Sequence, residues 1–436
     1  MAVKPMSSEV DVQIERAVAA LSKAGCDKGL FTHTFSFCEY WLDEQPSYSL
    51  TACYFASNIN AVMELQFCVA LTAEIKDSVS SLLSLQDLQH FCEQQGLPLF
   101  SDRKPINLSP LSIKKPWGQE IWFTGIEERG VARAGYDNCL SLLPWVLAAA
   151  PGRLSNFRHQ ALILLKILDP LAQAVKGDLY FELHEKKREV YVVTAVDESA
   201  WPDGVGGIRF GFDPDVVAQH PNEQAFKNSY LKAVEEYECI RREIDDLSEQ
   251  GVERLPSQLL ERELLLRAKI ESYSLVKPLS VGDVVQVPCL TPHSLLHGVR
   301  TVEFQTPVYE RLILSFAQKV LTQSHWDTEQ AVDKMIVPQP LPATFDVLCK
   351  ADGVLVERIV DFEDFEVRRI KLAAGASFKL CLEADYGLLM PVSGCVNLAG
   401  FTVESEQAVL LAKTWVGCSV NNMSEIDLCF LLAYPK

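Results

Sequence analysis

The feature that most constrains this chain is a long succession of short strand-like runs, which starts near Lys104 and continues almost to the C-terminus. The runs are roughly four to eight residues long, rich in β-branched and aromatic side chains, and separated by glycine, proline, aspartate or serine. Examples are QEIWFTGI, DLYFELH, EVYVVTAV, DVVQVP and VRTVEFQT. Short strands at this spacing are typical of a β-sandwich or barrel. The sequence therefore predicts a mainly β protein.

A helical segment interrupts this pattern at Asn222–Tyr273. Apolar residues such as Phe226, Tyr230 and Val234 recur at helical spacing, with charged residues between them, and Gly251 ends the run. A proline–serine pair then opens a second leucine-rich run, LLERELLLRAKI. The pattern predicts a two-helix hairpin inserted in the β domain at 222–273.

Strand-like runs return after about Pro342, for example SFKLCL, YGLLMPV and QAVLLAK. They predict a second β-sandwich at 341–436. No histidine follows His325, so this sandwich is unsuited to a histidine-based metal site. The predicted organisation is an N-terminal region of uncertain fold at 1–103, a metal-binding domain at 104–340 that carries the hairpin, and the C-terminal sandwich without metal ligands.

The N-terminal region has a mixed pattern. Glu9–Lys23 is typical of a short amphipathic helix, and SSLLSLQDLQHFCEQQG has helical spacing with Gly96 as its end. The apolar run ACYFASNINAVMELQFCVALTA fits either a strand or a buried helix, because periodicity alone does not separate the two. A further helical block is expected at roughly Asn138–Val175.

Composition limits the classes of function. The formal net charge of −18 argues against a protein that binds nucleic acid or anionic membranes. An anionic substrate would therefore have to bind at a local cluster of lysine and arginine. No apolar run reaches the roughly 18 residues of a membrane span, and the N-terminus lacks the apolar core of a secretion signal. The 13 cysteines are odd in number and form no CxxC pair, which predicts reduced thiols in a cytoplasmic protein.

The chemistry is concentrated in one predicted hairpin. Residues two apart on a strand face the same way, so Glu182 and His184 project together. The charged tetrapeptide 185–188 is a plausible turn, and Glu189 begins the returning strand. Two carboxylates and one imidazole at a strand end suit a divalent ion such as Zn, Mn or Fe.

A second motif, VGDVVQVPCLTPHSLLHGV, brings another imidazole to the same domain. A glycine–aspartate turn leads into an apolar strand, a proline and His293. The fold can place His293 opposite the hairpin, although the two lie far apart in the sequence. His297 is expected to be a packing or solvent-facing residue.

These motifs resemble the type I phosphomannose isomerases, which are metal-dependent members of the cupin superfamily. Lys115-Pro-Trp-Gly118 is similar to the family's Pro-Trp-Gly element. LLKILDPLAQAVKGDLYFELHEKKREVYVV is similar to the segment that contains its Gln-x-His-Pro and Lys-x-Glu strands. GDVVQVPCLTPH is similar to the family's histidine turn, and TVEFQTPVYERL to the strand that precedes its catalytic arginine. The resemblance covers about 104–334 without the helical insertion, and continues weakly into the C-terminal sandwich.

The resemblance implies two cupin-type β-sandwich or jelly-roll barrels, to which the sequence pattern adds the helical hairpin insertion and the mixed N-terminal region. It also implies a divalent metal ion, zinc in the first place, with manganese or iron as alternatives. Carried over by position, the metal ligands are Glu182, His184, Glu189 and His293, and the catalytic residues are Arg311, Glu303 and Lys187.

The activity implied is the interconversion of mannose 6-phosphate and fructose 6-phosphate through an enediol. Arg311 would stabilise the enediolate charge, Lys187 could touch the same oxygens, and Glu303 is a candidate base or ring-opening catalyst. The expected partner is a small phosphosugar, with no nucleic acid or membrane.

The sequence departs from the family pattern at the site itself. Glu182 stands where the family has glutamine, Glu185 where it has proline, and Leu290 where it usually has glycine. A second carboxylate makes a bound divalent ion formally neutral, which weakens its action as a Lewis acid. A second hypothesis therefore stays open: a metal-binding cupin of different or no catalytic activity, acting as a sugar-binding or regulatory protein.

Overall fold

The chain divides into two compact units, each assembled from separate stretches of sequence. The computed structural model describes residues 7–59, 62–152, 161–252, 254–317, 327–382, 384–398, 400–412 and 418–436. One unit comprises Met1–Leu111, Trp122–Leu165 and Phe345–Lys436, and the other comprises Ser112–Ile121 and Lys166–Thr344. The structure is mainly β with helical insertions, which confirms the predicted fold class. Within the described residues its sheets are open rather than closed barrels.

Two sheets form the sandwich of the Lys166–Thr344 unit. The six-stranded sheet has the order β17 (Val284–Val287), β14 (Glu189–Val196), β19 (Val299–Gln305), β12 (Leu164–Pro170), β7 (Gly118–Trp122) and β6 (Leu111–Lys115). The five-stranded sheet has the order β16 (Ser274–Leu279), β15 (Gly206–Phe212), β18 (His293–Leu295), β13 (Phe181–Leu183) and β20 (Leu312–Ser315). Tyr191 and Val193 of β14 pack with Ile208 and Phe210 of β15 in one apolar core, so these faces form the interior.

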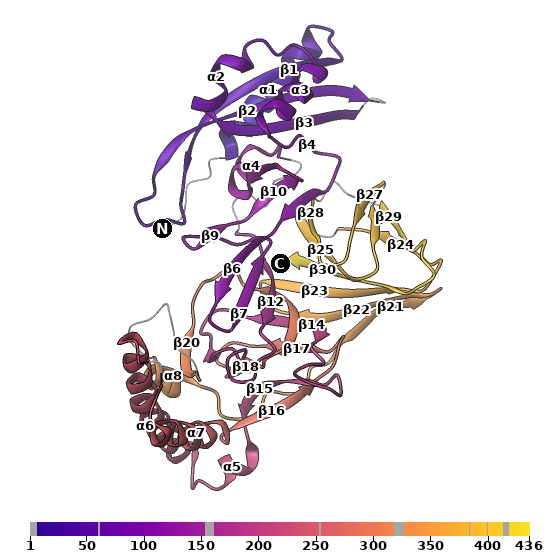
Figure 1. The fold of residues 1–436 in the computed structure, drawn as a ribbon. Helices are drawn as coiled ribbons and strands as arrows, with labels where there is room; N and C mark the ends of the chain where they lie inside the picture. The colour runs from indigo at the N-terminus through magenta and orange to yellow at the C-terminus, as the bar shows by residue number, and fades with distance from the viewer. Residues whose placement is uncertain are drawn as a thin grey trace. The chain divides into compact units, whose positions relative to one another are not determined.

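Helices cover the other face of the five-stranded sheet. They are α5 (Pro214–Ala218), α6 (Glu223–Glu249), α7 (Ser257–Glu271) and α8 (Thr328–Lys334). Phe226 and Tyr230 of α6 are buried in a cluster with Phe181 and Phe212 of the sheet, because apolar residues at this spacing occupy one face of a helix. The Asn222 side chain caps α6 by accepting a hydrogen bond from the amide of Ala225. Figure 1 shows α6 and α7 side by side, where the sequence predicted the hairpin.

The N-terminal part contains a four-stranded sheet with helices packed against it. Its elements are α1 (Ser7–Lys23), β1 (Lys28–Cys38), β2 (Ser47–Ile59), β3 (Val62–Leu71), α2 (Thr72–Val79), α3 (Leu85–Gln95) and β4 (Phe100–Ser101). The ambiguous apolar run therefore forms the β2–β3 pair. The predicted end of α3 is confirmed, since Gly96 adopts a left-handed conformation with φ of 64°.

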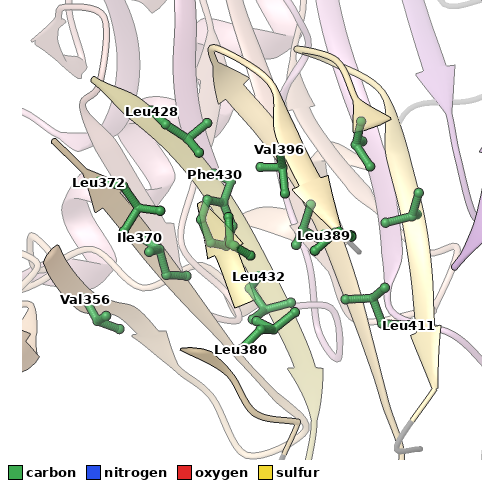
Figure 2. Close-up of a cluster of buried hydrophobic side chains, with 14 of the residues drawn as sticks. Val356, Ile370, Leu372, Leu380, Leu389, Val396, Leu411, Leu428, Phe430 and Leu432 are labelled. Carbon is green, nitrogen blue, oxygen red and sulfur yellow. The ribbon is translucent and has the colours of Figure 1, made fainter. Parts of the chain in front are cut away.

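The C-terminal sandwich pairs a nine-stranded sheet with a four-stranded one. The first has the order β11 (Cys139–Leu142), β10 (Arg133–Tyr136), β5 (Ile106–Ser109), β28 (Ala408–Ala412), β25 (Tyr386–Ser393), β30 (Leu428–Pro435), β23 (Phe365–Leu372), β22 (Val354–Asp361) and β21 (Asp346–Ala351). The second has the order β24 (Ser377–Leu380), β29 (Cys418–Asn421), β26 (Val396–Leu398) and β27 (Phe401–Val403). Figure 2 shows that their facing side chains, such as Leu389 and Phe430, are apolar.

The predicted helical block at about Asn138–Val175 is wrong over most of the part that the structure describes. A short helix, α4 (Leu143–Ala149), lies there, preceded by β11 and followed by β12; residues 153–160 lie outside the described residues. Consecutive residues of β12 are buried on both faces, and a strand of this kind lacks the alternation that would separate it from a helix.

A short two-stranded sheet, β8 (Ile126–Glu127) and β9 (Gly130–Val131), precedes this stretch. Within the described chain, no helix combines the length and apolarity that a membrane crossing needs.

Candidate metal centre

Four side chains predicted as ligands meet inside the sandwich of the Lys166–Thr344 unit. Glu182 of β13 pairs in register with His293 of β18, so the two are direct neighbours on one sheet. His184 follows the end of β13, and Glu189 begins β14 on the opposite sheet. Ligand atoms of Glu182, His184 and His293 lie within 4.8 Å of one another. Glu189 joins them, with its oxygens 3.0 Å from His293 Nε2 and 3.3 Å from His184 Nε2.

Hydrogen bonds fix the direction in which both imidazoles present their lone pairs. His184 Nδ1 donates to the carbonyl of Glu310 at 2.9 Å, and His293 Nδ1 donates to the carbonyl of Thr291 at 3.0 Å. In the neutral form of each ring the proton is then on Nδ1, so Nε2 carries a lone pair toward the carboxylates. This is the arrangement in which outer-shell acceptors orient metal-binding histidines.

Glu182, His184 and His293 could together hold a metal ion. His184 and Glu189 are only 1% and 2% exposed. Two buried atoms, Glu182 Oε2 and His184 Nε2, have no hydrogen-bond partner among the described residues. Burial and the nearby Lys187 lower the pKa of His184. A second proton on Nε2, which could form a hydrogen bond to Glu189, is therefore disfavoured. Two imidazole nitrogens and two carboxylates are a donor set that divalent transition-type ions accept.

Glu189 is the electrostatic centre of the group. Lys187 Nζ lies 2.6 Å from its Oε1, and the Tyr191 hydroxyl donates to its Oε2 at 2.5 Å. Burial alone would raise the pKa of Glu189, but Lys187, His184 and His293 hold it well below its usual range. The carboxylate is therefore ionised and available as a ligand near neutral pH.

Glu303 occupies the same interior face, one strand away. It pairs with Tyr191 across β14 and β19 and is 1% exposed. Burial raises the pKa of Glu303 well above its usual range, although Lys166 Nζ lies 3.2 Å from its Oε2. Burial would lower the pKa of Lys166, but Glu120, Glu303 and Glu189 raise it above its usual value, so Lys166 stays charged. A carboxyl group that exchanges a proton at higher pH than usual is suited to acid–base chemistry.

The sequence prediction missed Lys166, for which one signal was available. It is a single cation inside the apolar run LLKIL, and a lysine is rarely buried without a charged partner.

Arg311 lies at a more open edge of the site. Its Nη1 is 3.9 Å from Glu182 Oε2, and its guanidinium lies over the Tyr180 ring at 5.0 Å from the ring centroid. The side chain is 25% exposed, so it can reach a bound molecule. Lys187 thus contacts Glu189 and Arg311 approaches Glu182, whereas Glu303 lies on the strand next to β14.

Glu310 was also missed, and no local sequence pattern marks it. Its Oε1 accepts hydrogen bonds from the amides of Lys186 at 2.7 Å and Lys187 at 3.1 Å. Burial would raise the pKa of Glu310, but the amides of Lys186, Glu185 and Lys187 lower it. This carboxylate therefore holds the turn between His184 and Glu189.

Three other residues of the sequence motifs have structural roles. His297 donates from Nδ1 to Asp178 at 2.7 Å and stacks on Trp201, so it is a packing residue as expected. Trp117 belongs to the buried core. Leu290 has a φ of 62°, a left-handed conformation that favours glycine, which gives a physical reason for a glycine in this turn.

Sequence comparison gives no relatives: no family model matches this chain, and no curated protein matches it. Solved structures are similar in fold. Mannose 6-phosphate isomerase from Bacillus subtilis has a TM-score of 0.52 at 13% identity, over 76% of this chain and 98% of that one. A zinc-bound mannose 6-phosphate isomerase and the apo form from Salmonella typhimurium each have a TM-score of 0.54 at 13% identity, over 76% of this chain and 99% of theirs. Similarity at this identity establishes the fold.

Proposed function

We propose that this protein is a metal-dependent aldose–ketose isomerase that interconverts mannose 6-phosphate and fructose 6-phosphate. The observation that carries the proposal is the cluster of Glu182, His184, Glu189 and His293, with Lys187 directly beside it. The fold likeness to zinc-containing phosphomannose isomerases supports the substrate class. Zinc is the proposed ion for the same reason. The proposal includes a cytoplasmic location, which rests on the cysteine content.

In this proposal Glu182, His184, Glu189 and His293 would hold a divalent ion, which would supply Lewis-acid chemistry at the sugar oxygens. Arg311 supplies a fixed positive charge for the developing enediolate oxygen, because its guanidinium is always protonated. Lys187 is the second cation at those oxygens. Glu303 moves the proton between the adjacent carbons or assists ring opening, a role that its raised pKa favours.

The charge balance supports an anionic substrate. Lys187, Lys166 and Arg311 surround the cluster, and buried Glu303 tends to the neutral form because its pKa is raised. With a divalent ion in place, the positive charges of the ion, Lys187, Lys166 and Arg311 exceed the negative charges of the nearby carboxylates Glu182, Glu189, Glu120 and Glu310. A phosphosugar fits this excess better than a neutral sugar.

A second candidate is a metal-binding cupin without isomerase activity. The observation in its favour is Glu182, which adds a negative charge at the ion and reduces its action as a Lewis acid. In this reading the same cluster would bind a sugar without converting it.

A coupled assay separates the two. Zinc-loaded protein is given mannose 6-phosphate, and fructose 6-phosphate is measured, beside the His293→Ala variant and with unphosphorylated mannose as a second substrate. The proposal predicts turnover of the phosphosugar by the wild type and loss of that turnover in the variant. Fully zinc-loaded wild type that converts neither sugar would rule out the isomerase and favour the binding protein.

A further inference from the structure

Glu310 contacts the site through two different groups. Its main-chain carbonyl accepts the Nδ1 hydrogen bond of His184, and its carboxylate accepts the amides of Lys186 and Lys187. One residue therefore holds both ends of the short segment that carries a ligand and a catalytic candidate. Its chain neighbour Arg311 lies 3.9 Å from Glu182.

The two amide bonds define the conformation of the turn. Successive N–H groups that converge on one carboxylate oxygen form a small anion-binding concavity, which fixes the backbone between them. Other contacts hold the flanks: the amide of Leu290 donates to the carbonyl of His184 at 2.7 Å, and the amide of Arg188 donates to the Thr306 hydroxyl at 3.1 Å. In the middle, Lys334 Nζ lies 2.7 Å from the Glu185 carboxylate and the Cys289 thiol donates to the Lys187 carbonyl at 3.8 Å. Glu310 is the group that accepts the two successive backbone amides at the middle of the turn.

We propose that Glu310 is a positioning residue of this centre, which aims His184 Nε2 at the metal and directs Lys187 toward the substrate oxygens. The inference rests on the proposed metal centre and adds to it a residue that touches neither metal nor sugar. Loss of the carboxylate detaches the Lys186–Lys187 amides from the Glu310 segment. The Glu310 carbonyl that orients His184 and the backbone that carries Lys187 are then no longer fixed to each other. Partners of this outer kind typically contribute a factor of roughly 10 to 100 to metal affinity.

The test compares Glu310→Ala with Glu310→Gln, whose amide oxygen can accept the same two hydrogen bonds. The matched control is Asp197→Ala, because Asp197 also accepts a backbone amide, that of Ser199 at 2.8 Å, in an exposed turn of the same unit. Zinc affinity is measured by competition with a chelator, and the ligand field by the visible spectrum of the cobalt-loaded protein. We expect Glu310→Ala to bind zinc roughly 10 to 100 times more weakly, with an altered cobalt spectrum. Glu310→Gln and the control should remain close to the wild type.

Several outcomes would overturn the inference. One is a Glu310→Ala protein with wild-type zinc affinity and cobalt spectrum that only melts at a lower temperature, since that is a purely structural effect. If Glu310→Ala does not fold, Glu310→Asp decides: it keeps the charge but is one methylene too short for both amides, and it should weaken zinc binding in the same direction. Wild-type affinity and spectrum in that variant would also refute the inference. Neither readout needs a substrate, so an inactive wild type would refute the isomerase and leave this test intact.

Discussion

The two β-sandwiches of this chain share an architecture and differ in what their facing sheets enclose. In the C-terminal sandwich the facing side chains are apolar, as Figure 2 shows for Ile370, Leu389 and Leu432. In the sandwich of the Lys166–Thr344 unit, one part of the interior is apolar and another part contains carboxylates, imidazoles and lysines. The architecture accommodates either interior, so the chemistry comes from a few polar residues placed on a common frame.

The two interiors also differ in their contribution to folding stability. An apolar interior stabilises the fold directly, at roughly 25 cal/mol for each Å² of apolar surface removed from water. A buried charged group is tolerated only when partners compensate for the lost solvent, as Lys187 does for Glu189. The charged interior is therefore expected to serve function rather than stability.

The largest effect that tests this comparison is the loss of the metal. His184→Ala or His293→Ala should each abolish stoichiometric zinc binding, because one of four ligands is removed. The control is His297→Gln, which alters a histidine of the same unit whose partner is Asp178. Elemental analysis after gel filtration is the measurement. Unchanged zinc in both alanine variants would contradict the ligand assignment.

A core substitution in the C-terminal sandwich should have the opposite effect: it should lower stability and leave zinc binding unchanged. Leu389→Ala removes a fully buried side chain and should lower the free energy of unfolding by roughly 2–5 kcal/mol. Zinc content of the folded protein should not change. Chemical denaturation and elemental analysis on one sample measure both quantities. A Leu389→Ala protein that is as stable as the wild type would show that this core does not carry the stability assigned to it.

A smaller effect is expected from Glu182→Gln. The amide oxygen can still coordinate, so the metal should be kept, although with lower affinity. A bound ion would have one more net positive charge and would stabilise more strongly the negative charge that develops on the sugar in the proposed reaction. If the protein is the proposed isomerase, activity should therefore persist or rise in this variant, as measured by the coupled assay at saturating zinc. Loss of activity in a fully loaded variant would show that the carboxylate itself is required.

The smallest effect concerns pH in the metal-free protein. The pKa of His184 is lowered in the folded state, mainly by burial, from an ordinary value of 6.5. As pH falls below this value, the unfolded chain takes up the proton first, so the free energy of unfolding decreases, by at most about 1.4 kcal/mol per pH unit. His184→Gln should reduce this slope. It should leave the part due to His33, whose pKa is also lowered, and the part of opposite sign due to Glu303, whose pKa is raised. An unchanged slope in urea titrations between pH 7 and 5 would contradict the assignment.

Local patterns predicted the strands, the helical hairpin and the common orientation of Glu182 and His184 on one face of a strand. They could not separate a strand buried on both faces from a helix, which is why β12 was assigned to a helical block. They also gave no sign that β5, β10 and β11 join the C-terminal sheet, because such pairing depends on residues far away in the chain, as between Leu108 and Ala408. Glu310 was missed for the same reason: its role exists only once the fold brings it to the Lys186–Lys187 turn.

The position of the bound metal tests the central claim most directly. Crystals of the zinc-loaded protein are measured at wavelengths on both sides of the zinc absorption edge, and the anomalous difference map locates every zinc ion. The account predicts one strong peak among Glu182, His184, Glu189 and His293, at distances of roughly 2.0–2.2 Å from their ligand atoms. It predicts no zinc in the apolar interior of the C-terminal sandwich. A fully loaded crystal whose zinc lies away from these four side chains would contradict it.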